Sequence, residues 1–220
     1  MKTILVTGGA GYIGSHTVLK LLEQEYGVVI VDNLCNSKVN AIHQIESITG
    51  RKPVFYEGDV RDRTLLAGIF KAHPIQGVIH FAGLKAVAES QTKPLLYYDN
   101  NVAGSITVLE EALKANVHTV VFSSSATVYG EPGTTQYDET LPTKPINVYG
   151  RSKLMVENIL TDLVHANPEL RVACLRYFNP VGAHNSGLIG EDPLGIPNNL
   201  MPYLGQVALG RLPRLKVYGN

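Results

Sequence analysis

Two residues of the segment NVYGRSKLMVENILTDL, Tyr149 and Lys153, could act together in proton transfer. A spacing of four residues places both side chains on one face of a helix. An ammonium group beside a phenol favours the phenolate, so we expect the pKa of Tyr149 to fall below its usual value near ~10. A tyrosine in that state can serve as a general base near neutral pH. Because Tyr-x-x-x-Lys also arises by chance in many helices, the pair alone is a weak signal.

A glycine-rich loop near the amino terminus strengthens this interpretation. TGGAGYIGS follows an apolar run and opens a helical pattern, with glycines at Gly8, Gly11 and Gly14. Glycine permits a tight turn and a close approach of the backbone to a pyrophosphate, which free N–H groups at a helix start can bind. A turn with a packing role alone is the alternative, but the strand–loop–helix context favours a dinucleotide. A dinucleotide beside an activated tyrosine indicates hydride chemistry at a carbon that bears a hydroxyl.

Acidic residues follow the second and third apolar runs. Asp32 comes 18 residues after Gly14. A carboxylate there accepts hydrogen bonds from the adenosine ribose and repels a 2′-phosphate, so we expect NAD rather than NADP. The alternative is that Asp32 caps a turn. Asp59 ends the third run, where it could reach the adenine or cap the next helix, and the sequence does not decide between these roles.

Composition argues against several functional classes. The 220 residues are 45% hydrophobic, and 19 basic residues balance 19 acidic ones, so we expect no nucleic-acid-binding face. No apolar run approaches the ~18–20 residues that span a bilayer, and we expect no secretory signal. Two distant cysteines, Cys35 and Cys174, favour a reduced, cytoplasmic protein. The seven histidines lack metal-ligand spacing, so we expect no metal site.

Short β-branched runs alternate with helical patterns along the chain. The predicted strands are Thr3–Thr7, Val28–Val31, Val54–Tyr56, Gly77–Phe81, Thr119–Ser124 and Val172–Phe178. The predicted helices are Tyr12–Glu25, Val39–Thr49, Arg63–His73, Pro94–Ala115, Val148–Ala166 and one near Asn199–Gly210. Continuous apolar strands are typical of a parallel sheet buried on both faces. The alternation predicts a doubly wound, Rossmann-type α/β fold.

The composition of the sequence changes after Phe178, where Gly, Pro and Asn become frequent. Long irregular segments in compact domains are usually functional. We therefore expect a dinucleotide-binding domain over residues 1–180. Residues 181–220 would begin a smaller, truncated substrate-binding domain.

Together these features make the chain resemble the extended short-chain dehydrogenase/reductase superfamily. The blocks HFAGLKAVAES, YYDNN, FSSSATVYG, RYFNPVGAH and GEDPLGIPNNLMPY resemble, more narrowly, the UDP-glucose 4-epimerase family, and they extend over essentially the whole chain. The resemblance implies an NAD-dependent epimerase that interconverts UDP-galactose and UDP-glucose. It also implies transient oxidation at sugar carbon 4, a 4-keto intermediate, and a homodimer formed through the helices Pro94–Ala115 and Val148–Ala166.

The resemblance also implies roles for individual residues. Tyr149 matches the catalytic base, Lys153 the lysine that binds the nicotinamide ribose, and Ser125 the catalytic serine, because it directly precedes ATVYG. The implied cofactor contacts are Gly8, Gly11, Tyr12, Ile13, Gly14, Asp32, Asn33, Leu34, Cys35, Asn36, Ser37, Asp59, Val60, Phe81, Ala82, Gly83, Leu84, Lys85, Asn100, Ser125, Tyr149, Lys153 and Phe178. The implied substrate contacts are Lys85, Ser125, Tyr149, Asn179, Asn199 and Leu200.

A purely structural role is the alternative for several residues of this chain. Taken singly, Tyr149 and Lys153 could be an ordinary helix tyrosine and a solvated lysine, and we expect His80 to be a packed strand histidine rather than a base. The sequence departs from the resemblance at Ala88, where a glycine is usual. Family members also continue well beyond residue 220, so we expect the chain to be a fragment of a working enzyme.

Three other functions agree less well with the sequence than an epimerase does. A sugar-nucleotide 4,6-dehydratase would carry an acidic pair after Ser125, where this chain has Ala126 and Thr127. A simple reductase would prefer NADPH, which Asp32 opposes. A non-catalytic NAD-sensing module would have no need of an activated phenol.

Overall fold

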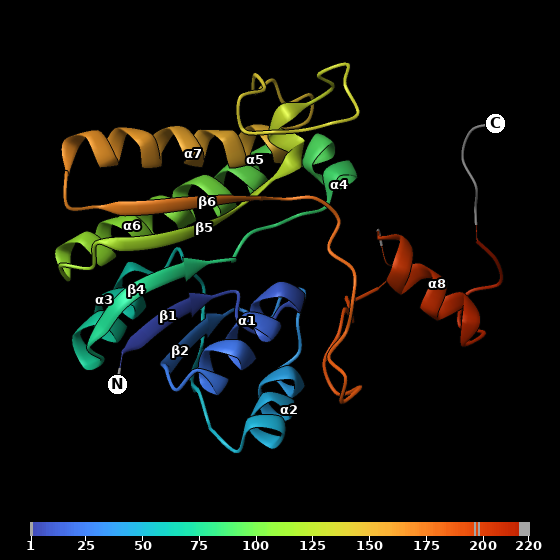
Figure 1. Cartoon of the computed structure of the whole chain (residues 1–220), viewed down its shortest axis with the longest axis horizontal. Helices are drawn as coiled ribbons and strands as arrows, with labels where there is room; N and C mark the ends of the chain where they lie inside the picture. The colour runs from blue at the N-terminus through green and yellow to red at the C-terminus, as the bar shows by residue number, and fades with distance from the viewer. Residues whose placement is uncertain (1, 196, 198, 216–220) are drawn as a thin grey trace.

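Six parallel strands form one sheet in the order β3-β2-β1-β4-β5-β6 (Figure 1). The computed structural model of the chain describes residues 2–195, 197 and 199–215. The strands are β1 (Thr3–Thr7), β2 (Gly27–Asp32), β3 (Val54–Glu57), β4 (Ile75–His80), β5 (Thr119–Ser125) and β6 (Arg171–Tyr177). The strand order reverses between β1 and β4, and ligands of such sheets bind where this reversal opens a crevice at the carboxyl ends. The predicted doubly wound fold is confirmed.

Helices cover both faces of the sheet because its central strands are apolar on both sides. Along β1, Leu5 and Val6 point to opposite faces and are both fully buried. One face packs on α1 (Tyr12–Glu23) and α2 (Asn40–Thr49) through a cluster that contains Val6. The other packs on α3 (Arg63–Ala72), α6 (Gly104–Lys114) and α7 (Val148–Ala166) through clusters around Leu5 and Phe122. These apolar layers fix the loops at the carboxyl edge of the sheet.

The predicted helix Pro94–Ala115 is continuous but contains a π-helical turn. It comprises α5 (Pro94–Tyr97), the π-helix η1 (Tyr98–Ala103) and α6. π-Turns often occur at functional sites, and this one carries Asn100. Helix α4 (Val87–Thr92) and the 3₁₀ turn η2 (Ala126–Tyr129) were not predicted, and both are short. The start of α4 has no side-chain cap, so its sequence lacks a start signal.

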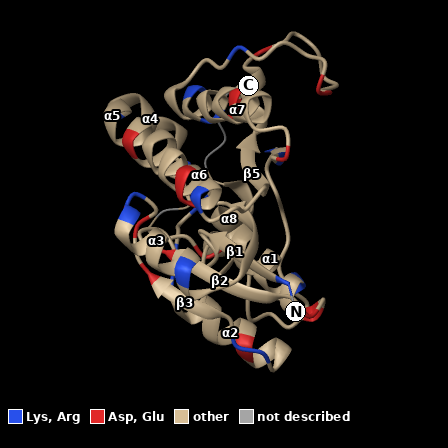
Figure 2. Cartoon of the chain, turned by 90° about the vertical axis from the view of Figure 1, so that its left-hand side faces the viewer, with Lys and Arg blue, Asp and Glu red and all other residues tan. Residues whose placement is uncertain are grey.

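The segment after β6 crosses the carboxyl edge of the sheet. In Figure 1 it runs, in orange, from the end of β6 past α1 toward α2, and then turns away to α8 (Leu200–Ala208). Basic and acidic residues are interspersed over the elements visible in Figure 2. Within the described residues, no helix has the length and apolar character needed to cross a membrane. Cys35 and Cys174 are both free thiols.

Candidate functional site

A cavity of about 630 Å³ lies at the carboxyl edge of the sheet. Its walls come from the glycine loop, the β2–α2 loop, the β4–α4 loop, the end of β5, the start of α7 and the segment after β6. The predicted site residues that line it are Gly8, Gly11, Tyr12, Ile13, Gly14, Asp32, Asn33, Cys35, Asn36, Ser37, Val60, Phe81, Ala82, Gly83, Lys85, Asn100, Ser125, Tyr149, Lys153, Phe178, Asn179 and Asn199. The fold therefore collects most of the predicted site around one cavity.

The glycine loop has a backbone path that side chains would block. Gly8 has a φ of +71°, and a Cβ there would lie 2.7 Å from the backbone nitrogen of Ala82. A Cβ on Gly14 would lie 2.1 Å from the carbonyl oxygen of Gly8. The N-cap of α1 is Gly11, which offers no side-chain cap. The first N–H groups of α1 are therefore free for an anion at this end of the cavity.

Asp32 is buried at the end of β2 and binds two loops of the cavity wall. Its Oδ2 accepts a hydrogen bond from the backbone N–H of Ala10 (3.0 Å) in the glycine loop. Its Oδ1 accepts from Leu34 N (2.9 Å) and Ser37 Oγ (2.8 Å) in the β2–α2 loop. The turn-capping role is thus present, and the same carboxylate also lines the cavity. A carboxylate at this position disfavours a ligand with an additional phosphate nearby.

Asp59 does not cap the next helix, which corrects one of its two expected roles. The N-cap of α3 is Asp62, whose side chain accepts a hydrogen bond from Leu65 N (3.0 Å). Asp59 instead binds Arg61 in a two-oxygen ion pair and accepts from Asn33 Nδ2 (3.0 Å). Hydrogen bonds from Arg61 hold the pKa of Asp59 well below its usual range. Asp59 lies outside the cavity wall and orients Asn33, which is part of it.

Three other predicted residues stand beside the cavity rather than on its wall. Leu34 packs against the apolar cluster of α1 and α2. The backbone of Leu84 pairs with the side-chain amide of Asn101, accepting at 3.0 Å and donating at 2.7 Å. Leu200 begins α8 and is 61% exposed. Leu34 is held by local packing and Leu200 faces solvent, and motif matching reveals neither.

Ser125, Tyr149 and Lys153 meet on the β5 side of the cavity, and the ends of β1 and β4 lie between them and Asp32. Ser125 ends β5, and Tyr149 lies in the first turn of α7, where Asn147 accepts a capping hydrogen bond from Gly150 N (2.7 Å). Lys153 is 4% exposed, and its Nζ donates to the carbonyl oxygen of Ser123 (2.8 Å). Burial lowers the pKa of Lys153 to about 8.

The pKa of Tyr149 is raised, contrary to the expectation from its spacing to Lys153. Burial raises it, and a hydrogen bond with the Ser125 side chain acts in the opposite direction. The Lys153 Nζ lies 5.9 Å from the centroid of the Tyr149 ring and bonds a backbone carbonyl instead. In the protein alone, desolvation of the phenolate therefore outweighs the hydrogen bond with Ser125. Ser125 is the neighbour that favours the deprotonated form.

A largely buried ion pair, which was not predicted, supports this side of the cavity. Arg176 of β6 donates to both carboxylate oxygens of Glu157 (3.1 and 2.8 Å), and Ser124 Oγ donates to Glu157 Oε1 (2.5 Å). Glu157 lies on α7 one turn after Lys153. The ion pair thus joins β6 to α7, the helix that carries Tyr149, and the Ser124 hydrogen bond joins the end of β5, which carries Ser125, to the same carboxylate. Glu157 and Arg176 lie 19 residues apart on different elements, so no local pattern in the sequence signals this contact.

His80 is a packed strand histidine, as expected. Its ring nitrogens contact Thr7 Oγ1 (2.6 Å) and Ser105 Oγ (2.9 Å) within the core. Burial, with a smaller contribution from the charge of Lys153, lowers the pKa of His80 to about 3. The ring is therefore neutral, and each of its nitrogens has a hydrogen-bonding partner. The described residues also contain no cluster of His, Cys, Asp or Glu arranged to hold a metal ion.

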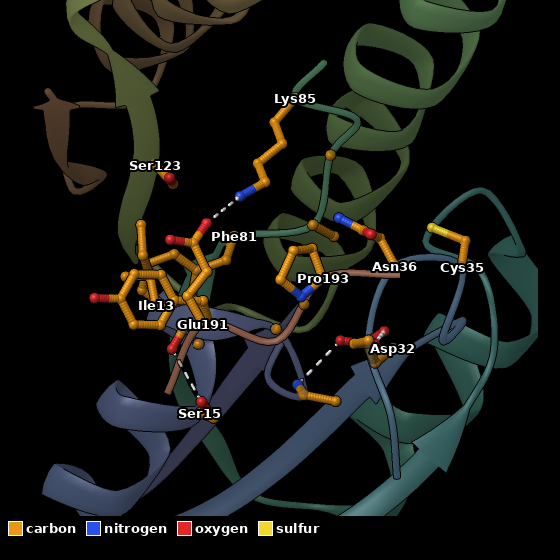
Figure 3. A pocket seen from close by; sticks show the side chains of 18 of the residues that line it. Ile13, Ser15, Asp32, Cys35, Asn36, Phe81, Lys85, Ser123, Glu191 and Pro193 are labelled. Atoms are coloured by element: carbon orange, nitrogen blue, oxygen red, sulfur yellow. Dashed lines mark hydrogen bonds and ion pairs between the residues drawn. The ribbon is translucent and has the colours of Figure 1, made fainter. Parts of the chain in front are cut away.

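Acidic residues of the segment after β6 line the cavity and were not predicted. Lys85 Nζ and Glu191 Oε1 form an ion pair at 3.2 Å, and Asn199 Nδ2 donates to the same oxygen at 2.5 Å. Figure 3 shows Lys85 and Glu191 reaching toward each other from opposite walls. The partners lie 106 residues apart in the chain, so local patterns carry no signal of the contact.

The two ends of the cavity suit different parts of one elongated ligand. The uncapped start of α1 suits a pyrophosphate, and the buried carboxylate of Asp32 suits ribose hydroxyls. The Ser125, Tyr149 and Lys153 end suits proton transfer to or from a hydroxyl. These groups therefore fit a dinucleotide, with a second substrate bound beside Ser125, Tyr149 and Lys153.

Known proteins are similar to this chain in both sequence and structure. The model of the "NAD dependent epimerase/dehydratase family" matches residues 4–220. The UDP-glucose 4-epimerase of Neisseria meningitidis serogroup A is 58% identical over 100% of this chain and 65% of its own length. That of Schizosaccharomyces pombe is 57% identical over 99% of this chain and 62% of its own length.

Solved structures show the same similarity. The UDP-glucose 4-epimerase of Bifidobacterium longum, crystallised with NAD+ and UDP, superposes with a TM-score of 0.97 at 52% identity, over 99% of this chain and 65% of that chain. The enzyme of Stenotrophomonas maltophila, with NAD and formylated UDP-arabinopyranose, has a TM-score of 0.96 at 52% identity, over 100% of this chain and 65% of that chain. The chain thus spans slightly less than two thirds of the length of these proteins.

Proposed function

The chain belongs to the NAD-dependent epimerase/dehydratase family, and on that premise we propose that it acts as a UDP-glucose 4-epimerase, interconverting UDP-galactose and UDP-glucose with bound NAD. One observation carries the proposal. Ser125, Tyr149 and Lys153 converge on the β5 side of a cavity whose wall also includes the uncapped start of α1. The names and bound ligands of the similar proteins support the choice of substrate and cofactor.

In this proposal the glycine loop and the start of α1 bind the NAD pyrophosphate, and Asp32 accepts from the adenosine ribose. Lys153 binds the nicotinamide ribose. When bound, NAD supplies a hydride acceptor that later returns the hydride to the sugar. Because the hydride returns, the reaction has no net oxidation. Asp32 makes the site more favourable for NAD than for NADP.

The protein's own groups handle the proton. Tyr149 accepts the proton of the sugar 4-hydroxyl as carbon 4 is oxidised, and gives it back when carbon 4 is reduced on its opposite face. Ser125 hydrogen-bonds the same oxygen, and its hydroxyl favours the Tyr149 phenolate. The 4-keto sugar must turn over between the two steps while its UDP stays bound. We assign that UDP contact to Asn179 and Asn199, which line the cavity.

The structure offers no acidic pair for a dehydratase at the expected place. Thr127 donates to Ser125 Oγ through its backbone N–H (3.2 Å) and through Oγ1 (3.0 Å). A hydroxyl and an alanine therefore stand where elimination of water would need a carboxylic acid and a carboxylate. We accordingly favour the epimerase.

We extend the proposal to organisation and location. Residues 1–180 would form the NAD-binding unit, and residues 181–220 would begin the substrate-binding unit; positions 196, 198 and 216–220 lie outside the described residues. The protein would be a cytoplasmic homodimer, supported by two free thiols and by exposed apolar side chains such as Leu95 on α5 and Met155 on α7. Ser125, Tyr149, Lys85 and the two asparagines would contact the UDP-sugar.

The test is conversion of UDP-galactose to UDP-glucose by the 220-residue chain without added NAD. We expect turnover in the parent and a loss of about 10²-fold or more in Tyr149→Phe, because the phenol is the proton acceptor. Tyr137→Phe, which removes an exposed phenol near the cavity, is the matched control and should keep its activity. Equal activity of Tyr149→Phe and the parent would overturn the proposal.

A further inference from the structure

The segment from Gly182 to Leu194 is attached to both sides of the cofactor cavity. At its start, the Tyr12 hydroxyl of α1 donates to the carbonyl oxygen of Gly182 (2.7 Å). Toward its end, Lys38 pairs with Asp192 (2.5 Å), and Leu194 N donates to Asn36 Oδ1 (3.4 Å). Tyr12 belongs to the predicted pyrophosphate loop, and Asn36 to the predicted adenosine loop. The segment therefore spans the cavity between its two binding loops.

An apolar residue anchors the middle of this segment. Ile189 is 5% exposed and packs in the cluster formed by α1, α2 and the strands beneath them. Its neighbours Leu188, Gly190 and Glu191 line the cavity, so the backbone passes directly along the opening. Burial of Ile189 ties the segment to the sheet independently of charge.

Two carboxylates of the segment, Glu191 and Asp192, line the cavity in which we propose that an anionic dinucleotide binds. A dinucleotide pyrophosphate would be repelled by Glu191 and Asp192 if these were its ligands. Each is instead neutralised by a lysine from the body of the protein, Glu191 by Lys85 at 3.2 Å and Asp192 by Lys38 at 2.5 Å. Figure 3 shows the first of these pairs bridging the cavity. The carboxylates thus bind the protein rather than the ligand.

We propose that Glu191 and Asp192 are positioning residues that hold the segment 182–194, with Ile189 as its anchor, across the NAD cavity and so slow the release of the dinucleotide. Both lysines are about half exposed, so their ion pairs are individually weak and sensitive to salt. Release then requires the segment to lift, which breaks two ion pairs and exposes Ile189. The inference rests on the proposed binding of NAD in this cavity.

The experiment measures the dissociation rate of NAD from the loaded 220-residue chain, using an excess of a second NAD-binding enzyme to trap what is released. We expect release to be about threefold faster in Asp192→Asn and in Glu191→Gln, and about tenfold or more faster in Ile189→Ala. Raising the salt concentration should speed release in the parent and have little effect in the double variant Glu191→Gln/Asp192→Asn. Glu23→Gln, which removes the surface ion pair with Lys20 outside the cavity, is the matched control and should release NAD at the parent rate.

Unfolding midpoints, measured in parallel, separate this role from a structural one. Faster release with an unchanged midpoint in Asp192→Asn supports the inference even if Ile189→Ala proves unstable. NAD that is held, but released at the same rate and with the same salt dependence in all variants, overturns the inference alone. A folded chain that holds no NAD overturns the proposed cofactor site together with the inference.

Discussion

Lys153 is an amine that folding removes almost completely from water. Burial lowers its pKa from 10.5 to about 8. Between these two pH values Lys153 binds more protons in the unfolded chain than in the folded one, so its contribution to the free energy of unfolding of the ligand-free chain should rise with pH. This shift of the Lys153 pKa corresponds to about 3 kcal/mol in the free energy of unfolding over this pH window. Burial raises the pKa of the Cys174 thiol to about 11, which acts in the opposite direction in this window. Denaturant titrations should therefore show a difference between the parent and Lys153→Met that grows with pH, and parallel pH curves for the two proteins would contradict this.

Ser125 controls the protonation of Tyr149 through a hydrogen bond. That bond lowers the Tyr149 pKa against the larger, raising effect of burial. Removing the hydroxyl in Ser125→Ala should therefore raise the pKa further and shift the acidic limb of the pH–rate profile to higher pH. Ser123→Ala is the matched control, because Lys153 bonds the backbone carbonyl of Ser123, which alanine keeps. An unshifted limb in Ser125→Ala would show that Ser125 does not act on the phenol.

At the level of elements, the ion pair of Glu157 and Arg176 joins α7 to β6. Glu157 is buried and accepts three hydrogen bonds, two from Arg176 and one from Ser124. Glu157→Ala leaves the guanidinium in a partly buried place without its carboxylate, so we expect a loss of about 3 kcal/mol in the free energy of unfolding.

Glu169→Ala is the control for this prediction. Glu169 is 83% exposed in its side chain and pairs loosely with His118 at 3.7 Å, so its removal should cost less than about 0.5 kcal/mol. Denaturant unfolding of both variants measures the difference. Equal losses in the two variants would mean that burial does not strengthen the role of Glu157.

The strands and major helices could be predicted from the sequence, because apolar runs and helical periodicity are local signals. The ends of Thr3–Thr7 and Val148–Ala166 agree with the structure to the residue. The π-turn η1 and the short helix α4 could not be predicted, since neither has a distinct local pattern.

The candidate site likewise has some features that the sequence predicts and others that it does not. The glycine loop and the Tyr149/Lys153 pair are motifs, and their meeting follows from the parallel sheet. The raised pKa of Tyr149 depends on burial, and the contact of Glu191 with Lys85 joins residues 106 positions apart. Such features become visible only when packing and long-range contacts are known.

For the whole molecule, the proposed homodimer predicts that exposed apolar residues on α5 and α7 are buried between subunits. Leu95 is 80% exposed in the single chain. Leu95→Lys should therefore shift the molar mass in solution from dimer toward monomer, because a buried lysine charge is costly. Leu209→Lys, just after α8 and 69% exposed, is the control. Light scattering at several concentrations measures the mass, and an unchanged dimer in Leu95→Lys would place the interface elsewhere.

The most direct measurement follows deuterium at carbon 4 of UDP-galactose through turnover by the NAD-loaded chain. If the site oxidises carbon 4 and returns the same hydride to the opposite face, the UDP-glucose formed should keep the label at carbon 4, with none exchanged into water. Tyr149→Phe should hold NAD and transfer the label at least about 10²-fold more slowly. Loss of the label to solvent, or no transfer by a chain that holds both NAD and UDP-galactose, would contradict the account.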